Sequence, residues 1–224
     1  MERIDVGVDG GVKKASEILR GRGVILFPTD TLYGLGADAF SDEAVDKIYA
    51  IKGRDEKKPI HCIVADIAMA EKYAEITDDA RLLFERLPPG GLTVILSAKG
   101  GSLPDRQAGA SGEKKQGIAR GLSTIGIRIP KNDFCVQLAR TFGKPFTATS
   151  ANVANLPTLT SIDEILAQLG WAAEGIDLVI DAGELPPSAP STVVDLSREE
   201  PAIVREGVIP ASDVWNAIRS ERDN

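Results

Sequence analysis

The residues best suited to chemistry are two cations at the end of a predicted helix, Lys52 and Arg54, separated by Gly53. Positive charge is favourable at a helix C-terminus, so the pair could serve the helix alone. Arg also binds phosphate oxygens through two parallel hydrogen bonds, and Lys57 and Lys58 follow shortly afterwards. The spacing therefore favours a compact phosphate site. Because exposed charges contribute little to stability, removing Lys52 or Arg54 is expected to change the melting temperature little.

Further polar, small or basic residues stand at the ends of predicted strands. In open α/β sheets such ends converge on a ligand, although Ser, Asn and Gly also form ordinary turns. The residues in question are Thr29–Tyr33, Thr124, Arg128, Ser150–Asn152, Ser191–Thr192 and Arg205.

The single histidine, His61, limits the reaction types that the chain can support. It is the only candidate base for a Ser-His-Asp or Cys-His mechanism, and it lies in an apolar segment that is typical of a strand. Its simplest interpretation is a histidine at a strand end with a local hydrogen bond. Cys62 and Cys135 lie in apolar stretches and are predicted to be buried free thiols. No Cys-x-x-Cys pair exists, so no metal site is predicted.

The composition is that of an ordinary globular protein. The chain has 224 residues, of which 43% are hydrophobic and 26% charged. These values exclude collagen, a coiled coil and general disorder. With 26 Lys and Arg against 33 Asp and Glu, the net charge is −7, which argues against a broad nucleic-acid surface but allows a local basic patch. No apolar run reaches the roughly 20 residues that span a membrane, so a cytoplasmic protein without membrane contact is expected.

Apolar periodicity and turn residues predict a single α/β domain over residues 1–224, with a twisted mixed sheet flanked by helices and a concave substrate site. Residues 29–36 are expected to form a polar loop, and the glycine-rich residues 97–123 a flexible loop. The predicted helices cover residues 12–20, 41–51, 67–73, 78–87, 134–141, 161–169 and 212–218, with Ser41, Ser161 and Ser212 at their N-termini. The predicted strands cover residues 24–27, 60–65, 92–96, 124–129, 146–149, 176–180, 192–195 and 203–205.

No common nucleotide-binding motif occurs. The chain lacks the Gly-x-x-x-x-Gly-Lys-Ser/Thr loop, and Gly34-x-Gly36 is too short for a dinucleotide fingerprint. Six segments in order nevertheless resemble the YrdC family. They are Phe27–Ala37 (FPTDTLYGLGA), Ile51–Arg54 (IKGR), Ile125–Pro130 (IGIRIP), Thr149–Asn152 (TSAN), Pro190–Leu196 (PSTVVDL) and Val204–Gly207 (VREG).

This resemblance implies the YrdC-like fold in its single-domain form and a nucleotidyltransferase activity. The family makes L-threonylcarbamoyladenylate and pyrophosphate from L-threonine, bicarbonate and ATP, with Mg²⁺ accompanying the ATP. The product supplies a downstream tRNA threonylcarbamoyl transferase.

The same resemblance implies roles for individual residues. Lys52 and Arg54 match the family's Lys-x-Arg motif and are the expected catalytic residues. The residues expected at the threonine are Thr29, Arg128, Ser150 and Ser191. Those expected at the ATP are Lys52, Arg54, Thr124, Asn152, Thr160 and Arg205.

Three departures from the family pattern keep alternatives open. Asp55 and Lys58 stand where many members have Pro and Asn, Ile63 stands where many have His, and the turn Pro89–Gly91 lacks its last Pro. One alternative is a module that binds tRNA or double-stranded RNA; even a synthase could make a weak RNA contact. Another is a related enzyme that uses carbamoyl phosphate, as in hydrogenase maturation. A third is a YrdC paralogue with a different substrate.

Overall fold

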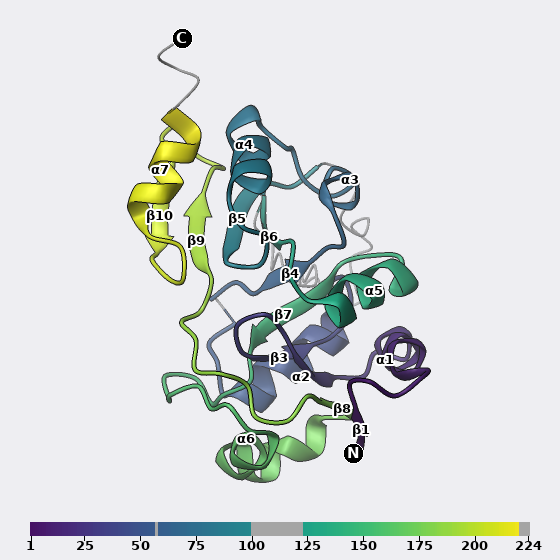
Figure 1. Ribbon diagram of the computed structural model, residues 1–224. Coiled ribbons are helices and arrows are strands. Elements are labelled where there is room, and N and C mark those ends of the chain that lie inside the picture. The colour runs from purple at the N-terminus through teal and green to yellow at the C-terminus, as the bar shows by residue number, and fades with distance from the viewer. Residues whose placement is uncertain (57, 100–122, 220–224) are drawn as a thin grey trace.

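The strands of the chain hydrogen-bond into one sheet in the computed structural model, which describes residues 1–56, 58–99 and 123–219 (Figure 1). Within these residues the strand order is β1-β8-β2-β3-β7-β4-β6-β5-β9-β10. The strands are β1 (Glu2–Asp5), β2 (Ile25–Pro28), β3 (Tyr33–Gly36), β4 (His61–Ile63), β5 (Leu92–Ser97), β6 (Thr124–Arg128), β7 (Phe146–Ser150), β8 (Leu178–Asp181), β9 (Thr192–Asp195) and β10 (Ala202–Arg205).

The sheet is mixed, as the sequence predicted. β8 pairs in parallel with β1 and β2, β4 with β6, and β5 with β9, while the remaining neighbours are antiparallel. The helices are α1 (Gly11–Arg20), α2 (Asp42–Lys52), α3 (Ile67–Ala70), α4 (Asp78–Arg86), α5 (Asp133–Phe142), α6 (Ile162–Leu169), α7 (Ala211–Arg219) and the 3₁₀ helix η1 (Gly170–Gly175).

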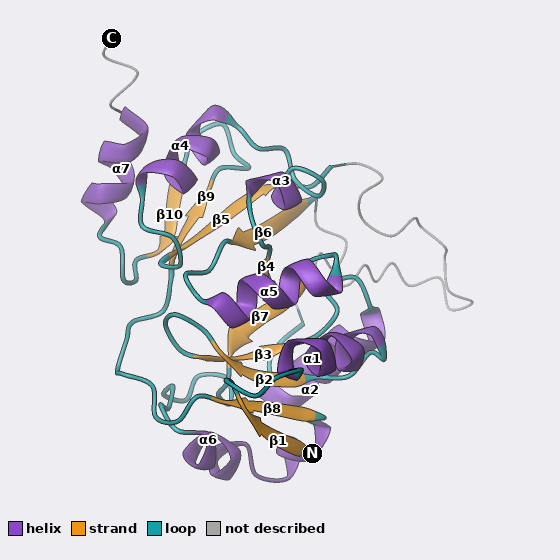
Figure 2. Cartoon of the chain, turned by 45° about the vertical axis from the view of Figure 1, so that its right-hand side comes forward, coloured by secondary structure: helices purple, strands orange, loops and turns teal. Residues whose placement is uncertain are grey.

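Helices pack on both faces of the sheet because successive strand residues point to opposite faces (Figure 2). In β2, Ile25 and Phe27 join a core with α1 and α5, whereas Leu26 joins the core that contains α2, α4, α6 and α7. Phe27 stacks edge-on against Phe146 of β7, with 5.4 Å between ring centroids. Both faces of the central strands are therefore dry, which fixes their register.

Most helices begin and end close to the predicted residues, because capping side chains and glycines act within a few residues of each end. The Ser41 hydroxyl caps α2 by accepting a hydrogen bond from the Ala44 amide, 3.3 Å away. Gly53 and Gly143 end α2 and α5 in the left-handed region, with φ of 56° and 83°. The cap predicted at Ser212 is wrong, because α7 already begins at Ala211.

Two predicted loops have different outcomes. Residues 33–36 are not a loop, because Tyr33–Gly36 is β3, which pairs with both β2 and β7. Its glycines leave room for the Phe27 ring: a Cβ at Gly36 would lie 2.8 Å from a ring carbon. Of the loop predicted over 97–123, residues 100–122 lie outside the described part of the chain, and Ser97 belongs to β5. Within the described ranges, no helix is both long and apolar enough to cross a membrane.

Candidate active site

A cavity of about 1000 Å³ opens on one face of the sheet, over β4, β6, β5, β9 and β10. Strand alternation builds part of its wall, because in β5 and β9 every second residue faces the cavity while its neighbours face the core. The strand residues that line the cavity include His61, Thr93, Ile95, Gly126, Arg128, Val193 and Asp195. The core residues between them include Cys62, Val94, Ile127 and Val194.

The charged residues of the cavity wall are mostly cations. The described residues that line it include Arg54, Lys58, Arg128, Arg198 and Arg205. Asp195 is the only described carboxylate in the lining. Its oxygens already accept hydrogen bonds from the Ser197 amide and hydroxyl and from Arg198 Nε, 2.6–3.0 Å away. The cavity therefore favours an anionic ligand.

Arg128 is held at the cavity wall by a buried ion pair. Its Nη2 donates to Asp30 Oδ2 at 2.9 Å and to Thr31 Oγ1 at 2.8 Å, and the Arg128 side chain is only 5% exposed. Gly90 makes room for this carboxylate, because a Cβ there would lie 2.2 Å from Asp30 Oδ2. Among the residues that the structure describes, Asp30 Oδ1 and Arg128 Nε have no hydrogen-bond partner. Arg128 thus keeps a buried donor unused.

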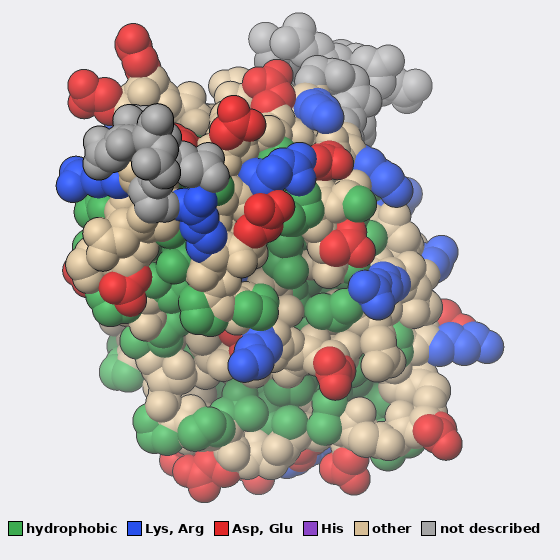
Figure 3. Space-filling model, turned by 45° about the horizontal axis from the view of Figure 1, so that its top comes forward, with side chains coloured by type: hydrophobic (Ala, Val, Ile, Leu, Met, Phe, Trp, Pro, Cys, Tyr) green, Lys and Arg blue, Asp and Glu red, His purple; other side chains and the backbone are tan. Residues whose placement is uncertain are grey.

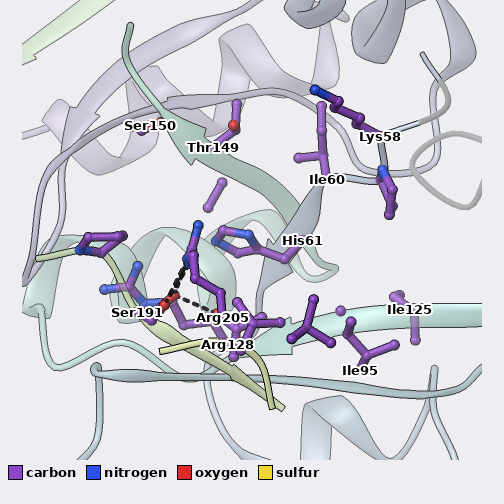
Figure 4. Close-up of a pocket in the computed structure, with 18 of the residues that line it drawn as sticks. Lys58, Ile60, His61, Ile95, Ile125, Arg128, Thr149, Ser150, Ser191 and Arg205 are labelled. Carbon is purple, nitrogen blue, oxygen red and sulfur yellow. Dashed lines mark hydrogen bonds between the residues drawn. The ribbon is translucent and has the colours of Figure 1, made fainter. Parts of the chain in front are cut away.

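Arg205 reaches the cavity from β10 through a backbone contact. Its Nη2 and Nε donate to the Ser191 carbonyl oxygen at 2.7 and 3.2 Å, and the Ser191 hydroxyl lies 2.9 Å from Thr93 Oγ1 (Figure 4). Gly207 permits this close approach, since a Cβ there would lie 2.1 Å from the Pro190 carbonyl oxygen. Burial and the nearby Arg128 and Arg54 lower the pKa of Arg205.

Arg54 is placed by the turn that ends α2. Because Gly53 adopts the left-handed conformation, the Arg54 amide can donate back to the Tyr49 carbonyl at 3.1 Å. The Arg54 guanidinium then bonds the carbonyl oxygens of Lys58 (3.4 Å) and Pro59 (3.2 Å). These bonds hold the approach to β4 through two backbone carbonyls.

Lys52 does not lie where the sequence placed it. Lys52 is 1% exposed and is not among the residues that line the cavity. Its ammonium donates to the Ser150 carbonyl, to the Asn152 carbonyl at 2.8 Å and to Asn152 Oδ1 at 3.0 Å. Burial and Arg54 lower the pKa of Lys52 to about 7, while the three oxygen acceptors favour its ammonium form. The expectation that Lys52 is exposed is therefore wrong, and with it the reason for expecting little effect of Lys52 on stability.

His61 faces the cavity rather than forming the local hydrogen bond expected of it. Among the described residues no hydrogen bond to its ring is seen, and its ring lies close to Arg205 (Figure 4). Burial, followed by the charges of Arg128, Arg205 and Arg54, lowers the pKa of His61 to about 3. Cys62 and Cys135 are buried free thiols, as predicted, and burial raises the pKa of Cys62 to about 12.

The structure gathers most of the predicted site residues. Those that line the cavity are Thr29, Arg54, Thr124, Arg128, Ser150, Ser191 and Arg205. Those that do not are Lys52, Asn152 and Thr160, whose hydroxyl lies 3.4 Å from Glu184 Oε1. Sequence reasoning did not propose a role for Arg198 or Asp195, because nothing local to β9 marks them as cavity residues.

Thr29 shapes its loop rather than offering a free hydroxyl. Its Oγ1 donates to the Leu32 carbonyl at 2.7 Å and accepts from the amides of Thr31 and Leu32. This set uses the whole bonding capacity of a hydroxyl. Ser191 is therefore the better placed of the two hydroxyls expected to contact threonine.

The fold and the cavity place this chain among α/β proteins that have one mixed sheet and a cationic cavity on a face of that sheet. The chain belongs to the Sua5/YciO/YrdC family, whose model, described as "Telomere recombination", matches residues 17–207. A Methanocaldococcus jannaschii protein, provisionally named a threonylcarbamoyl-AMP synthase, is 37% identical over 194 residues, which are 87% of this chain and 84% of the relative.

Solved structures agree with this membership. P. abyssi Sua5 in complex with L-threonine superposes with a TM-score of 0.82 at 29% identity, over 97% of this chain and 60% of that chain. E. coli YciO superposes with a TM-score of 0.78 at 27% identity, over 95% of this chain and 97% of that chain. The chain thus spans less than two thirds of the P. abyssi protein.

Replacing the buried ammonium in Lys52→Met is expected to lower the free energy of unfolding by about 2 kcal/mol, because three oxygens lose their donor. The pKa of Lys52 is about 7 in the folded chain against an ordinary value of 10.5. The unfolded chain therefore binds more protons between these values, and the parent protein gains stability from Lys52 as the pH rises from 7 to 10.

Denaturant unfolding of both proteins at several pH values measures this difference. The exposed Lys72→Met is the matched control and should behave like the parent at every pH. A difference between parent and Lys52→Met that is small, or that does not grow with pH, would contradict the assignment.

Removing the counterion in Asp30→Ala is expected to lower the free energy of unfolding by about 3 kcal/mol, because Arg128 is left buried and unpaired. Asp30→Asn should lose less, since its amide oxygen still accepts from Arg128. Urea unfolding midpoints and slopes measure both variants. Equal, small losses in the two variants would show that the ion pair does not stabilise this corner of the fold.

Proposed function

We propose that the chain is a nucleotidyltransferase that forms L-threonylcarbamoyl-AMP and pyrophosphate from L-threonine, bicarbonate and ATP. The observation that carries the proposal is the cationic cavity, formed by the family's own segments, in a chain whose relative is named for this activity. The complex of P. abyssi Sua5 with L-threonine supports the choice of amino acid. The product would pass to a tRNA threonylcarbamoyl transferase.

The reaction suits a cavity rich in cations. The uncharged amine of threonine and bicarbonate give an N-carboxylate and water, with CO₂ as the species that the amine captures. The N-carboxylate oxygen then bonds the α-phosphorus of ATP as the bond from that phosphorus to pyrophosphate breaks. Several anions must meet, so the barrier is largely electrostatic, and fixed guanidinium groups at Arg54, Arg128 and Arg205 would stabilise the developing charge. Holding both substrates in one cavity supplies much of the remaining rate. No general base is required once the N-carboxylate exists.

Lys52 would contribute to this reaction indirectly, by holding the backbone next to the cavity in place. Its ammonium fixes the backbone at Ser150, the last residue of β7, and at Asn152 just beyond it, and Ser150 lines the cavity. We therefore assign Lys52 as a positioning residue and Arg54 as the member of the Lys-x-Arg pair that faces the substrates.

Mg²⁺ would enter with ATP. No group of three or more His, Cys, Asp or Glu side chains that could hold a metal is found in the described part of the chain. Asp195, the carboxylate in the described lining, is already engaged by Ser197 and Arg198. Mg²⁺ binds readily to substrate phosphates with few protein ligands, so the triphosphate itself is its expected holder.

A paralogue with a different substrate is the second candidate. Lys58, one of the departures from the family pattern, lines the cavity and adds a cation there. A more anionic substrate would suit this wall. An RNA-binding role has weaker support, because the Lys and Arg side chains on the face shown in Figure 3 are interspersed with Asp and Glu.

Incubation with ATP, labelled bicarbonate and each amino acid in turn tests the function. Threonine should support pyrophosphate release and a labelled adenylate, serine should support less, and valine least. A site that bonds a hydroxyl rejects an analogue without it more strongly than one that lacks only a methyl group. Equal turnover of valine and threonine would contradict the proposal. Faster turnover of an amino acid other than threonine would favour a paralogue with a different substrate.

Arg54→Ala is expected to lower adenylate formation at least about tenfold, which corresponds to roughly 1.4 kcal/mol of transition-state stabilisation. The reason is the loss of a cation that lines the cavity. Initial rates at saturating threonine and varied ATP measure the effect. The exposed Arg140→Ala, which removes the same charge elsewhere, serves as the control, and full activity in Arg54→Ala would remove this residue from the mechanism.

A further inference from the structure

The imidazole of His61 lies between the two sets of cations in the cavity wall. Arg54 and Lys58 belong to the segment that leads into β4, and Arg128 and Arg205 belong to β6 and β10. Figure 4 shows the ring within the cavity, with Lys58 on one side and Arg205 close by on the other. His61 therefore stands where ligand groups bound by the two sets would meet.

The fold provides room for this side chain. His61 pairs with Ala148 of β7, and the next residue, Cys62, pairs with Ile127 of β6. Gly126 lies beside His61 on β6, and a Cβ at Gly126 would lie 3.0 Å from the His61 Cβ. The absence of a side chain at Gly126 thus admits the imidazole to the wall.

Among the described lining residues, cationic donors outnumber carboxylate acceptors. The carboxylate of Asp195 is engaged by Ser197 and Arg198. Several lining hydroxyls also hydrogen-bond neighbouring groups, among them those of Thr29, Thr31, Thr93, Ser150, Ser191 and Ser197. A neutral imidazole carries one lone pair as well as one N–H, and no described residue bonds the His61 ring. His61 therefore offers an unused acceptor among guanidinium groups.

We propose that His61 accepts a hydrogen bond from the α-amino group of the substrate and so makes the site specific for a free amino acid. This inference rests on the proposed function, in which Arg128 binds the carboxylate of the amino acid. Ile63 pairs with Arg128, so His61 lies two residues, roughly 6.6 Å, further along the same face. An α-amino acid carries its carboxylate and its amine on one carbon, and Arg128 and His61 line the same cavity.

The surrounding charges suit this role. Arg54, Arg128 and Arg205 face His61, and with burial they keep its ring neutral, because the pKa of His61 lies near 3. The same cations disfavour an ammonium group on the ligand and so favour the uncharged amine. When that amine donates an N–H to His61, its own lone pair stays available for CO₂.

Calorimetric titration of the parent, His61→Ala and His61→Asn with three ligands tests the proposal. The ligands are L-threonine, (R)-3-hydroxybutanoate, which is threonine without its amino group, and ATP. His61→Ala should weaken threonine binding about tenfold and leave the other two affinities within about twofold, because one hydrogen bond is lost. His61→Asn should recover part of the threonine affinity, since its amide oxygen is an acceptor.

Arg128→Lys is the contrasting variant. It should weaken threonine and 3-hydroxybutanoate together, because both ligands carry the carboxylate. Melting temperatures of all variants check that each one folds. The ratio of threonine affinities between parent and His61→Ala should be constant from pH 8 to pH 6, as expected for a ring that stays neutral.

Several results would overturn the inference. They are an unchanged threonine affinity in His61→Ala, an equal loss for threonine and 3-hydroxybutanoate, and a parent-to-variant ratio that collapses as the pH falls through 6.5. A parent protein that binds ATP but not threonine would overturn the proposed function as well. Threonine binding that is intact in the parent and unaffected by His61→Ala would overturn this inference alone.

Discussion

Cations that face a common cavity repel one another, and the rest of the site depends on how the fold holds them without neutralising them. Backbone carbonyls do most of this work. Arg54 bonds the carbonyls of Lys58 and Pro59, and Arg205 bonds that of Ser191. A carbonyl fixes a guanidinium by its dipole but leaves the full charge available to a ligand. A wall paired throughout with carboxylates would have the same shape and little attraction for anions.

Arg128 is the exception, and its burial explains why. At 5% side-chain exposure it cannot rely on water, so Asp30 supplies a counterion and Thr31 a further acceptor. The pair leaves Nε of Arg128 unsatisfied beside the cavity. Such an orphaned donor is expected where a ligand oxygen completes the hydrogen bonds. The neutral ring of His61 complements this wall, because it adds an acceptor without adding negative charge.

Sequence patterns predicted the elements whose determinants are local. Ser41, Gly53 and Gly143 mark helix ends by capping chemistry that acts within a few residues, and the strands with apolar alternation were found nearly in full. The elements that were missed depend on distant partners. β3 contains two glycines and gives no strand signal, yet it pairs with β2 and β7 on its two sides and packs against Phe27. β1, at the edge of the sheet, pairs with β8, and Arg3 forms ion pairs with the distant residues Asp163 and Asp181.

The directions of the Lys52 and Arg54 side chains could not be predicted from the sequence around them. Type and spacing identified both cations, but not which way each one points. On a helix terminus, Gly53 in the left-handed conformation turns the chain between them. Lys52 therefore keeps its helical direction into the interior, where Ser150 and Asn152 receive it, while Arg54 leaves the helix and reaches the cavity. Lys52 orders the end of β7, and Arg54 lines the cavity that would hold the substrates. The turn at Gly53 therefore connects the residue that positions Ser150 with the residue that would bind the ligand.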